Sequence, residues 1–253
     1  MIENWINIEG EYISLKDTPQ LLRELNLMPL FLRRYFETKY TKDIVPDEEE
    51  QINFQRNFLK REGIKDNTAL EKWLLANKKT EKEMNNILFN SLKIEKFKNN
   101  KFKEHVESLF LKKKSLLDRV TYSLIRVKSR AKAAELHLRL KEEEATFPDL
   151  ASTFSEGVEN VLHGLIGPVE FGNINPIISE RLRNSSPGEL WPPFEIESWW
   201  LILRSERFIP ATLNEAMESR LINEMYENWI KEKISNPITS LEKSNLIENK
   251  KNI

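Results

Sequence analysis

Hydrophobic side chains recur every three or four positions through most of the first 117 residues. Representative positions are Leu21, Leu22, Leu25, Leu32, Tyr35 and Phe36. Apolar residues at this spacing share one face of an α-helix, so the region is predicted to be an array of amphipathic helices. Proline and glycine interrupt the pattern at 28–29, 44–47 and 62–63, and helices are expected to end or begin there.

At Val120 the helical pattern gives way to an alternating one. Residues 120–127 are rich in β-branched and aromatic side chains, which predicts a strand and marks a domain boundary. The pattern then predicts two helices, over 131–144 and 147–154. Residues 201–203 are predicted to form the last strand.

A helical period returns after Pro210 and continues to about residue 230. Its apolar positions are Leu213, Met217, Leu221, Met225, Trp229 and Ile230. Such a stripe needs a partner surface, and the amino-terminal helices are the expected partner. The two ends of the chain are therefore predicted to close on each other.

The patterns together predict an α+β protein, in which a sheet domain is inserted into an all-helical module. A chain of 253 residues is long enough for two domains. The expected boundaries are 1–118 for the helical module, 119–208 for the sheet domain and 209–235 for a closing helix that packs on the module. Residues 236–253 are polar and are predicted to form a flexible tail.

Charge and hydropathy exclude several classes of partner. The net charge of −1 provides no overall field that would attract nucleic acid or an anionic membrane surface, so neither is expected as a partner. No apolar run approaches the roughly 20 residues of a membrane span. The first ten residues lack a basic segment followed by an apolar one, so no secretory signal is expected and a cytoplasmic location is predicted.

No cofactor or metal is expected either. The chain has no cysteine, and its three histidines, His105, His137 and His163, are scattered, which argues against zinc. The acidic run 142–144 would point in several directions on a helix and could not chelate as a unit. Residues 164–167 lack the lysine and the helix start of a phosphate loop.

A series of short segments resembles, in order and spacing, a parvulin domain, the fold of one class of peptidyl-prolyl isomerases. The segments are 123–127, 147–151, 154–157, the glycine-containing turn 163–168, Pro176, 188–189, 192–193 and 201–203. The helical module and the closing helix that ends at 227–230 look like the parvulin-containing chaperones of bacterial envelopes. Residues 117–127 are similar to a cyanobacterial branch of parvulin-like proteins.

The resemblance implies a four-stranded sheet surrounded by helices, with a proline-accepting hollow on the sheet. It also implies that Ile166, Ile174 and Ile177 line this hollow, at positions where parvulins carry apolar side chains. The paired histidines of the family fall on Ser123 and Trp200, which become the expected catalytic and substrate-binding residues.

Prolyl isomerisation requires no nucleophile or metal, because no bond is made or broken. The enzyme has to lower a rotational barrier of roughly 18–20 kcal/mol, by gripping the proline ring and favouring the twisted amide. Ser123 can donate and accept a hydrogen bond, and Trp200 offers an N–H group and a flat face for the ring. The cysteine or aspartate of the family falls on Gly157, so the polar half of the site is largely replaced.

Three functions are therefore open at this point. The first is a parvulin-type isomerase or foldase that acts on extended, proline-containing protein or peptide segments. The second is a non-catalytic chaperone or peptide-binding adaptor, and the third is a structural scaffold whose side chains fill the hollow. Ser123 and the three isoleucines also have purely structural interpretations, and only one of Trp199 and Trp200 can face the hollow if the strand is regular.

Overall fold

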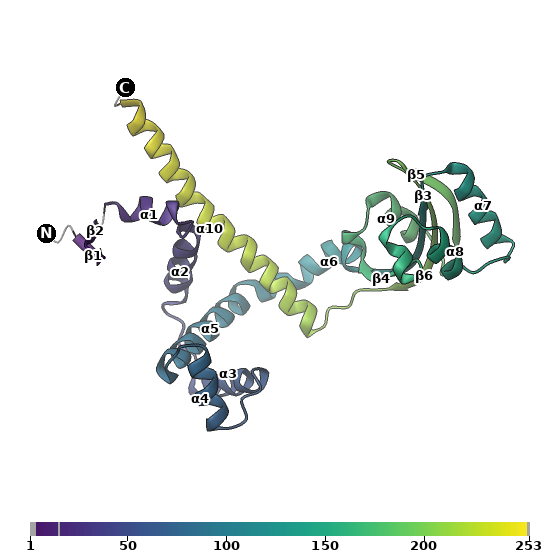
Figure 1. Ribbon diagram of the computed structural model, residues 1–253. Helices are drawn as coiled ribbons and strands as arrows, with labels where there is room; N and C mark the ends of the chain where they lie inside the picture. The colour runs from purple at the N-terminus through teal and green to yellow at the C-terminus, as the bar shows by residue number, and fades with distance from the viewer. Residues whose placement is uncertain (1–3, 15, 252–253) are drawn as a thin grey trace. The chain divides into compact units, whose positions relative to one another are not determined.

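The computed structural model describes residues 4–14 and 16–251, and it contains two compact units (Figure 1). One unit combines Met1–Val106 with Glu218–Ile253, and the other is Glu107–Met217. The second unit is thus inserted into the first along the sequence. The predicted fold class, a helical module interrupted by a four-stranded sheet domain, is confirmed.

The first five helices begin at one of two local signals, a proline in the first turn for two of them and a side-chain cap for the other three. They are α1 (Thr18–Glu24), α2 (Met28–Thr41), α3 (Glu48–Arg61), α4 (Asn67–Ala76) and α5 (Glu81–Phe102), and the 3-10 turn η1 (Lys103–His105) separates α5 from α6 (Val106–Leu117). Asp47 and Glu50 form a reciprocal capping box at the start of α3, and Thr80 and Glu83 form another at the start of α5. Each box satisfies two backbone N–H groups that the helix leaves without a partner.

A short hairpin that the sequence analysis did not predict precedes these helices. Strand β1 (Asn4–Ile8) pairs antiparallel with β2 (Glu11–Ser14). Glu9 and Gly10 join them with φ angles of 51° and 96°. Positive φ at both central residues is the hallmark of the two-residue hairpin turn, and a glycine there is the signal that could have predicted it.

The last helix, α10 (Glu215–Lys251), packs against the first unit from Glu218 onward. The Trp229 ring centroid lies 4.8 Å from that of Tyr40 and 5.2 Å from that of Phe97. The buried carboxylate of Glu37 on α2 accepts a hydrogen bond from the hydroxyl of Tyr226 on α10. Aromatic packing and this buried bond therefore join the two ends of the chain.

Helix α10 does not stop where the flexible tail is predicted. Its backbone stays helical through Pro237 to Lys251, and residues 252–253 lie outside the described part of the chain. The polar composition suggested a tail, but Leu, Glu and Lys, which are frequent in this segment, are also strong helix formers. A low content of apolar residues is thus compatible with a continued helix.

The second unit is built on one antiparallel sheet. Its strands are β3 (Arg119–Val127), β4 (Leu165–Glu170), β5 (Leu190–Ile196) and β6 (Trp199–Ile209), in the order β4-β3-β6-β5. Residues 163–168, expected as a turn, thus largely belong to the edge strand β4. The prolines of the sheet, Pro168 in β4 and Pro192 and Pro193 in β5, all lie on edge strands, where a missing N–H group need not break the hydrogen-bond ladder.

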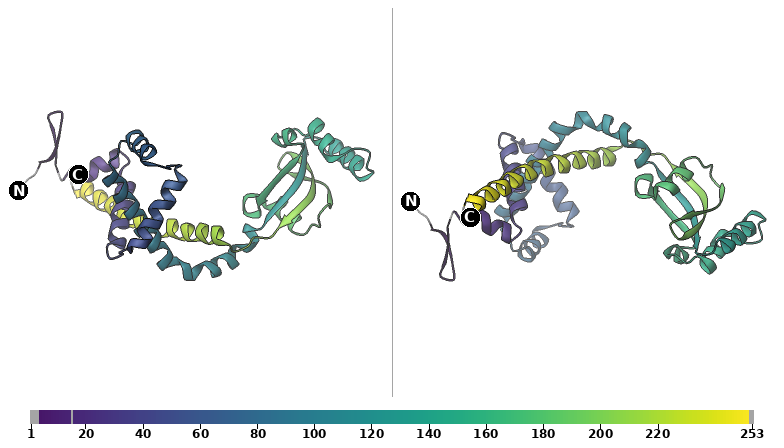
Figure 2. Two further views of the ribbon diagram at one scale, coloured as in Figure 1. Left: turned by 90° about the horizontal axis from the view of Figure 1, so that it is seen from below. Right: turned by 90° about the horizontal axis from the view of Figure 1, so that it is seen from above.

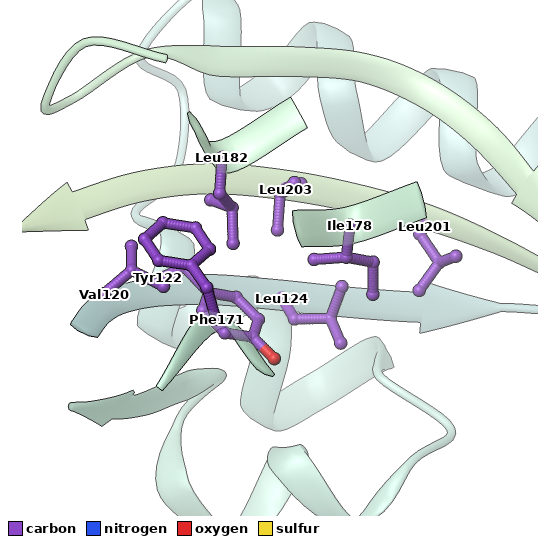
Figure 3. Packing of buried hydrophobic residues seen from close by; sticks show 8 residues of the cluster. All are labelled: Val120, Tyr122, Leu124, Phe171, Ile178, Leu182, Leu201 and Leu203. Atoms are coloured by element: carbon purple, nitrogen blue, oxygen red, sulfur yellow. The ribbon is translucent and has the colours of Figure 1, made fainter. Parts of the chain in front are cut away.

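Helices cover both faces of this sheet. Helices α7 (Arg130–Lys141) and α8 (Phe147–Phe154) pack on one face, and α9 (Pro176–Arg183) packs on the other (Figures 1 and 2). Because successive side chains of a strand point to opposite faces, β3 contributes to two separate cores. Ile125 and Val127 pack with α7 and α8, whereas Tyr122 and Leu124 pack with α9 (Figure 3).

Candidate functional site

A hollow of about 330 Å³ lies on the α9 face of the sheet. It is lined by Tyr122, Leu124, Arg126, Ile166, Asn173, Ile174, Asn175, Ile178, Ile196, Glu197, Trp199 and Leu201. The labelled side chains of Leu124, Ile178 and Leu201 lie close together on this face (Figure 3). The hollow is open, whereas a purely structural scaffold would require side chains to fill it.

The structure brings two of the three predicted isoleucines into the hollow. Ile166 on β4 and Ile174, just before α9, both line it. Ile177 does not, and its side chain is 42% exposed, whereas Ile178 is only 7% exposed and lines the hollow. Successive residues of a helix point about 100° apart, so a shift of one position moves the contact from Ile177 to Ile178.

Ser123 does not line the hollow and lies on the opposite face of the sheet from it. It lies between Tyr122 and Leu124 in β3, and because these two side chains face α9, the Ser123 side chain points to the other face. The Ser123 hydroxyl is buried and donates a hydrogen bond of 2.5 Å to Oε1 of Glu206. The structural interpretation of Ser123, a strand serine satisfied by a neighbour, is the one that the structure supports.

Trp200 also lies on the face of the sheet opposite the hollow. It pairs across the strands with Val127 and packs on the core formed with α7 and α8, and the guanidinium carbon of Arg130 lies 5.3 Å from its ring centroid. The neighbouring Trp199 lines the hollow instead. The expectation that only one of the two indoles can face the hollow therefore holds, but the residue is Trp199.

Sequence reasoning missed a charged pair at the hollow. Arg126 Nε lies 2.8 and 3.0 Å from the two carboxylate oxygens of Glu159, and Nη2 lies 2.5 Å from Oε2. Glu159 comes from the 3-10 turn η2 (Val158–Leu162). The hydroxyl of the buried Ser155 donates a further bond of 2.6 Å to Glu159 Oε1. The available signal was an arginine within a strand whose neighbouring positions are apolar.

The hydrogen bonds keep this pair ionised. Burial by itself raises the pKa of Glu159, but the bonds from Arg126 and Ser155 outweigh burial and hold that pKa below its ordinary value. The bond to Glu159 raises the pKa of Arg126. Burial also raises the pKa of the nearby Tyr122 phenol, so it is a neutral hydroxyl at pH 7. The hollow thus combines apolar walls with an internally neutralised ion pair.

Gly157 leaves the space that the pair needs. A Cβ atom at this position would lie 2.1 Å from Arg126 Nε and 2.3 Å from Glu159 Oε2. The backbone φ of −105° is one that any residue adopts, so a side chain at this position would displace Arg126 and Glu159 rather than strain the backbone. The resemblance assigns a cysteine or aspartate to position 157. In this chain the Arg126 and Glu159 side chains occupy the space that such a side chain would fill.

Other candidate chemistry lies away from the hollow. His163 has a partner, since its Nδ1 lies 2.5 Å from Ser152 Oγ, but it does not line the hollow. Ser152 Oγ itself donates to the carbonyl of Pro148.

Among the described residues no group of three or more histidine or acidic side chains could hold a metal ion. Nor does any helix in that part of the chain combine the length and apolar character of a membrane span.

The comparison with protein families gives one match. Residues 118–207 match the family described as Rotamase, the PPIC-type PPIase domain. No curated protein is similar to the chain at a significant level.

Solved structures that are similar to this chain include two PrsA proteins and one PpiD domain. Peptidylprolyl isomerase PrsA from Bacillus anthracis is 17% identical, with 87% of this chain and 97% of that chain covered and a TM-score of 0.43. The foldase PrsA from Streptococcus pneumoniae is 14% identical, with 94% and 93% covered and a TM-score of 0.41. The parvulin domain of PpiD from E. coli is 21% identical, with 39% and 95% covered and a TM-score of 0.33.

The family match and the observed sheet cover the same stretch of chain. The match begins at residue 118, just before β3, and ends at residue 207, within β6. All four strands and the hollow lie between these points or overlap them. Residues 118–207 therefore match the PPIC-type, or parvulin-type, PPIase domain, and along the sequence this stretch interrupts a helical module.

Proposed function

We propose that this protein is a parvulin-type peptidyl-prolyl isomerase that acts as a foldase on extended, proline-containing protein or peptide segments. The observation that carries the proposal is the hollow, an open site with apolar walls in a domain that matches the family. Its volume of about 330 Å³ is in the range of small-ligand sites. The proline ring is expected to contact Leu124, Ile178 and Trp199.

The residues of the hollow can favour rotation without covalent chemistry. Rotation about the X-Pro bond passes through a twisted amide, in which the nitrogen lone pair is no longer shared with the carbonyl group. Apolar walls hold the proline ring and exclude water, so polar groups act there in a medium of low dielectric constant. Binding energy lowers the barrier only where it is larger for the twisted state than for the planar one.

The polar groups available for this task differ from those that the resemblance implies. The lining residues include no histidine and no cysteine, and the side-chain donors among them belong to Tyr122, Arg126, Asn173, Asn175 and Trp199. We therefore expect catalysis to depend on hydrogen bonding and desolvation alone. A cytoplasmic location and a polypeptide client remain predictions from the sequence.

The first prediction concerns the rate of isomerisation itself. Adding the full-length protein to tetrapeptides of the type Ala-X-Pro-Phe is expected to accelerate cis/trans exchange in proportion to protein concentration, as measured by NMR exchange spectroscopy. A peptide with alanine in place of proline serves as the binding control. A rate equal to the uncatalysed one, with proline-dependent binding retained, would identify a non-catalytic chaperone. Absence of both would contradict the proposal altogether.

A further inference from the structure

The ion pair at the hollow is asymmetric in its exposure. The Arg126 side chain lines the hollow and is 31% exposed, whereas the Glu159 side chain is 1% exposed. The acceptor is thus buried behind the donor, and only the donor is accessible from the hollow. The other charged residue among the lining residues is Glu197, in the turn between β5 and β6.

Arg126 has side-chain N–H groups that Glu159 does not bind. A guanidinium group carries five N–H donors in a fixed plane. Glu159 accepts bonds from Nε and Nη2, and within the described part of the chain no group accepts a bond from Nη1. Two N–H groups of Nη1 are therefore available to a ligand in the hollow.

The position of the guanidinium group is fixed before any ligand arrives. Ser155 Oγ accepts a bond of 3.0 Å from the Arg126 backbone N–H and donates one to Glu159, so a single hydroxyl holds both partners. The missing side chain at Gly157 leaves room for the pair. A donor held in this way needs little reorganisation when charge develops beside it.

We propose that Arg126 contacts the substrate, donating an Nη1 hydrogen bond to the imide nitrogen of the X-Pro bond as it twists, and that Glu159 positions Arg126 and masks its charge. This inference rests on the function proposed above. Twisting localises the lone pair on nitrogen and removes negative charge from the carbonyl oxygen. A donor to nitrogen therefore stabilises the twisted state selectively, whereas a donor to the carbonyl oxygen would stabilise the planar one.

Kinetics of Arg126 variants test the catalytic part of the inference. We expect Arg126→Met to lower kcat for a tetrapeptide by about tenfold or more, the scale of losing one preorganised donor. The dissociation constant of the peptide, read from tryptophan fluorescence, should change less than about threefold, since the contact forms in the twisted state. Arg126→Lys, which keeps the charge and a donor, should retain more activity than Arg126→Met.

A purely structural role for Arg126 would give a different pattern. In that case Arg126→Met and Arg126→Lys would weaken peptide binding to the same extent as they lower kcat. That result would contradict the inference. An unchanged kcat in Arg126→Met, with isomerisation retained, would contradict it as well.

The masking role of Glu159 predicts a change in charge preference that can be measured by binding alone. Two peptides are compared, with Glu or Lys before proline. Glu159→Gln unmasks Arg126 and should shift the ratio of their affinities several-fold toward the Glu peptide, because an accessible guanidinium attracts a carboxylate. The double variant Arg126→Met with Glu159→Gln should remove this shift.

The two proposals fail in distinguishable ways. If the wild-type protein binds neither peptide, the proposed function is contradicted. If it binds both but Glu159→Gln leaves the affinity ratio unchanged, Arg126 does not contact the ligand. A shift that persists in the double variant would mean that another group responds to the lost carboxylate, and would also overturn the inference.

Discussion

Replacing Glu159 by alanine is expected to lower the free energy of unfolding of the sheet domain by about 3–5 kcal/mol. The loss is large because Arg126 keeps its charge but loses the carboxylate that accepts from Nε and Nη2, and Ser155 loses its acceptor as well. Amide hydrogen exchange along β3 reads the stability of this unit directly, since these strand amides report its global opening.

A matched control is available in the same unit. Glu135 on α7 is exposed, and its Oε1 lies 3.9 Å from Nη1 of Arg139. It therefore also belongs to an ion pair, but to one at the surface. Glu135→Ala should cost less than about 1 kcal/mol. Equal losses for Glu159→Ala and Glu135→Ala would show that the buried pair contributes nothing beyond a surface one.

The same carboxylate gives the stability of the domain a pH dependence with a defined sign. The pKa of Glu159 is lower in the folded protein than its ordinary value, so the folded state favours the ionised form. Its contribution is complete above the unfolded-state pKa and is lost as pH falls through the folded-state pKa. Acidification should therefore destabilise the wild-type domain more than it destabilises Glu159→Gln.

Replacing Trp199 by alanine is expected to weaken binding of a proline peptide by about tenfold or more, which corresponds to about 1.4 kcal/mol or more. Trp199 contributes a flat apolar wall to the hollow, and the Lys128 ammonium lies 5.3 Å from its ring centroid. An aromatic face of this kind can hold a proline ring by close apolar contact. Titration by isothermal calorimetry measures the affinity without relying on the indole that is removed.

The neighbouring indole is the control for this experiment. Trp200→Ala should leave peptide affinity within about twofold, because Trp200 packs with α7 and α8 on the other face of the sheet. It should instead lower the stability of the domain, since a cavity replaces the ring. If Trp200→Ala weakens binding and Trp199→Ala does not, the site lies on the opposite face of the sheet.

Local signals were sufficient to predict most of the helices. The capping residues Asp47 and Thr80 lie within three positions of the groups that they satisfy, so the sequence contains the whole interaction. The hairpin before α1 also had a local signal, the glycine at its turn, which was not used. The change of period at Val120 predicted the domain boundary, and the resemblance to parvulins implied the four-stranded sheet.

The face of each strand could not be predicted in the same way. Alternation separates Tyr122 and Leu124 from Ser123, but which set meets the hollow depends on where α9 packs. The ladder between β3 and β6 also contains an irregularity at Thr121 and Tyr122. A shift of one residue exchanges the two faces of a strand. Such a shift explains why Ser123 and Trp200, which were expected at the hollow, lie on the other face of the sheet.

Arg126 was missed for a related reason. Its partner Glu159 lies 33 residues further along the chain, in a 3-10 turn whose position no short-range pattern indicates. A strand arginine is usually exposed to solvent, and only the fold reveals that this one faces a hollow beside a buried carboxylate. The role of Gly157, which leaves space for the Arg126 and Glu159 side chains, depends on the same long-range contact.

The central claim is that the hollow on the α9 face accepts a proline ring. The most direct measurement is the structure of the full-length protein with a bound tetrapeptide of the type Ala-Ala-Pro-Phe, by crystallography or by intermolecular nuclear Overhauser effects. We expect the proline ring to contact Trp199, Leu124 and Ile178, with the X-Pro nitrogen directed toward Arg126. A proline ring bound beside Trp200, or bound only to the helical module with the hollow empty, would contradict the claim.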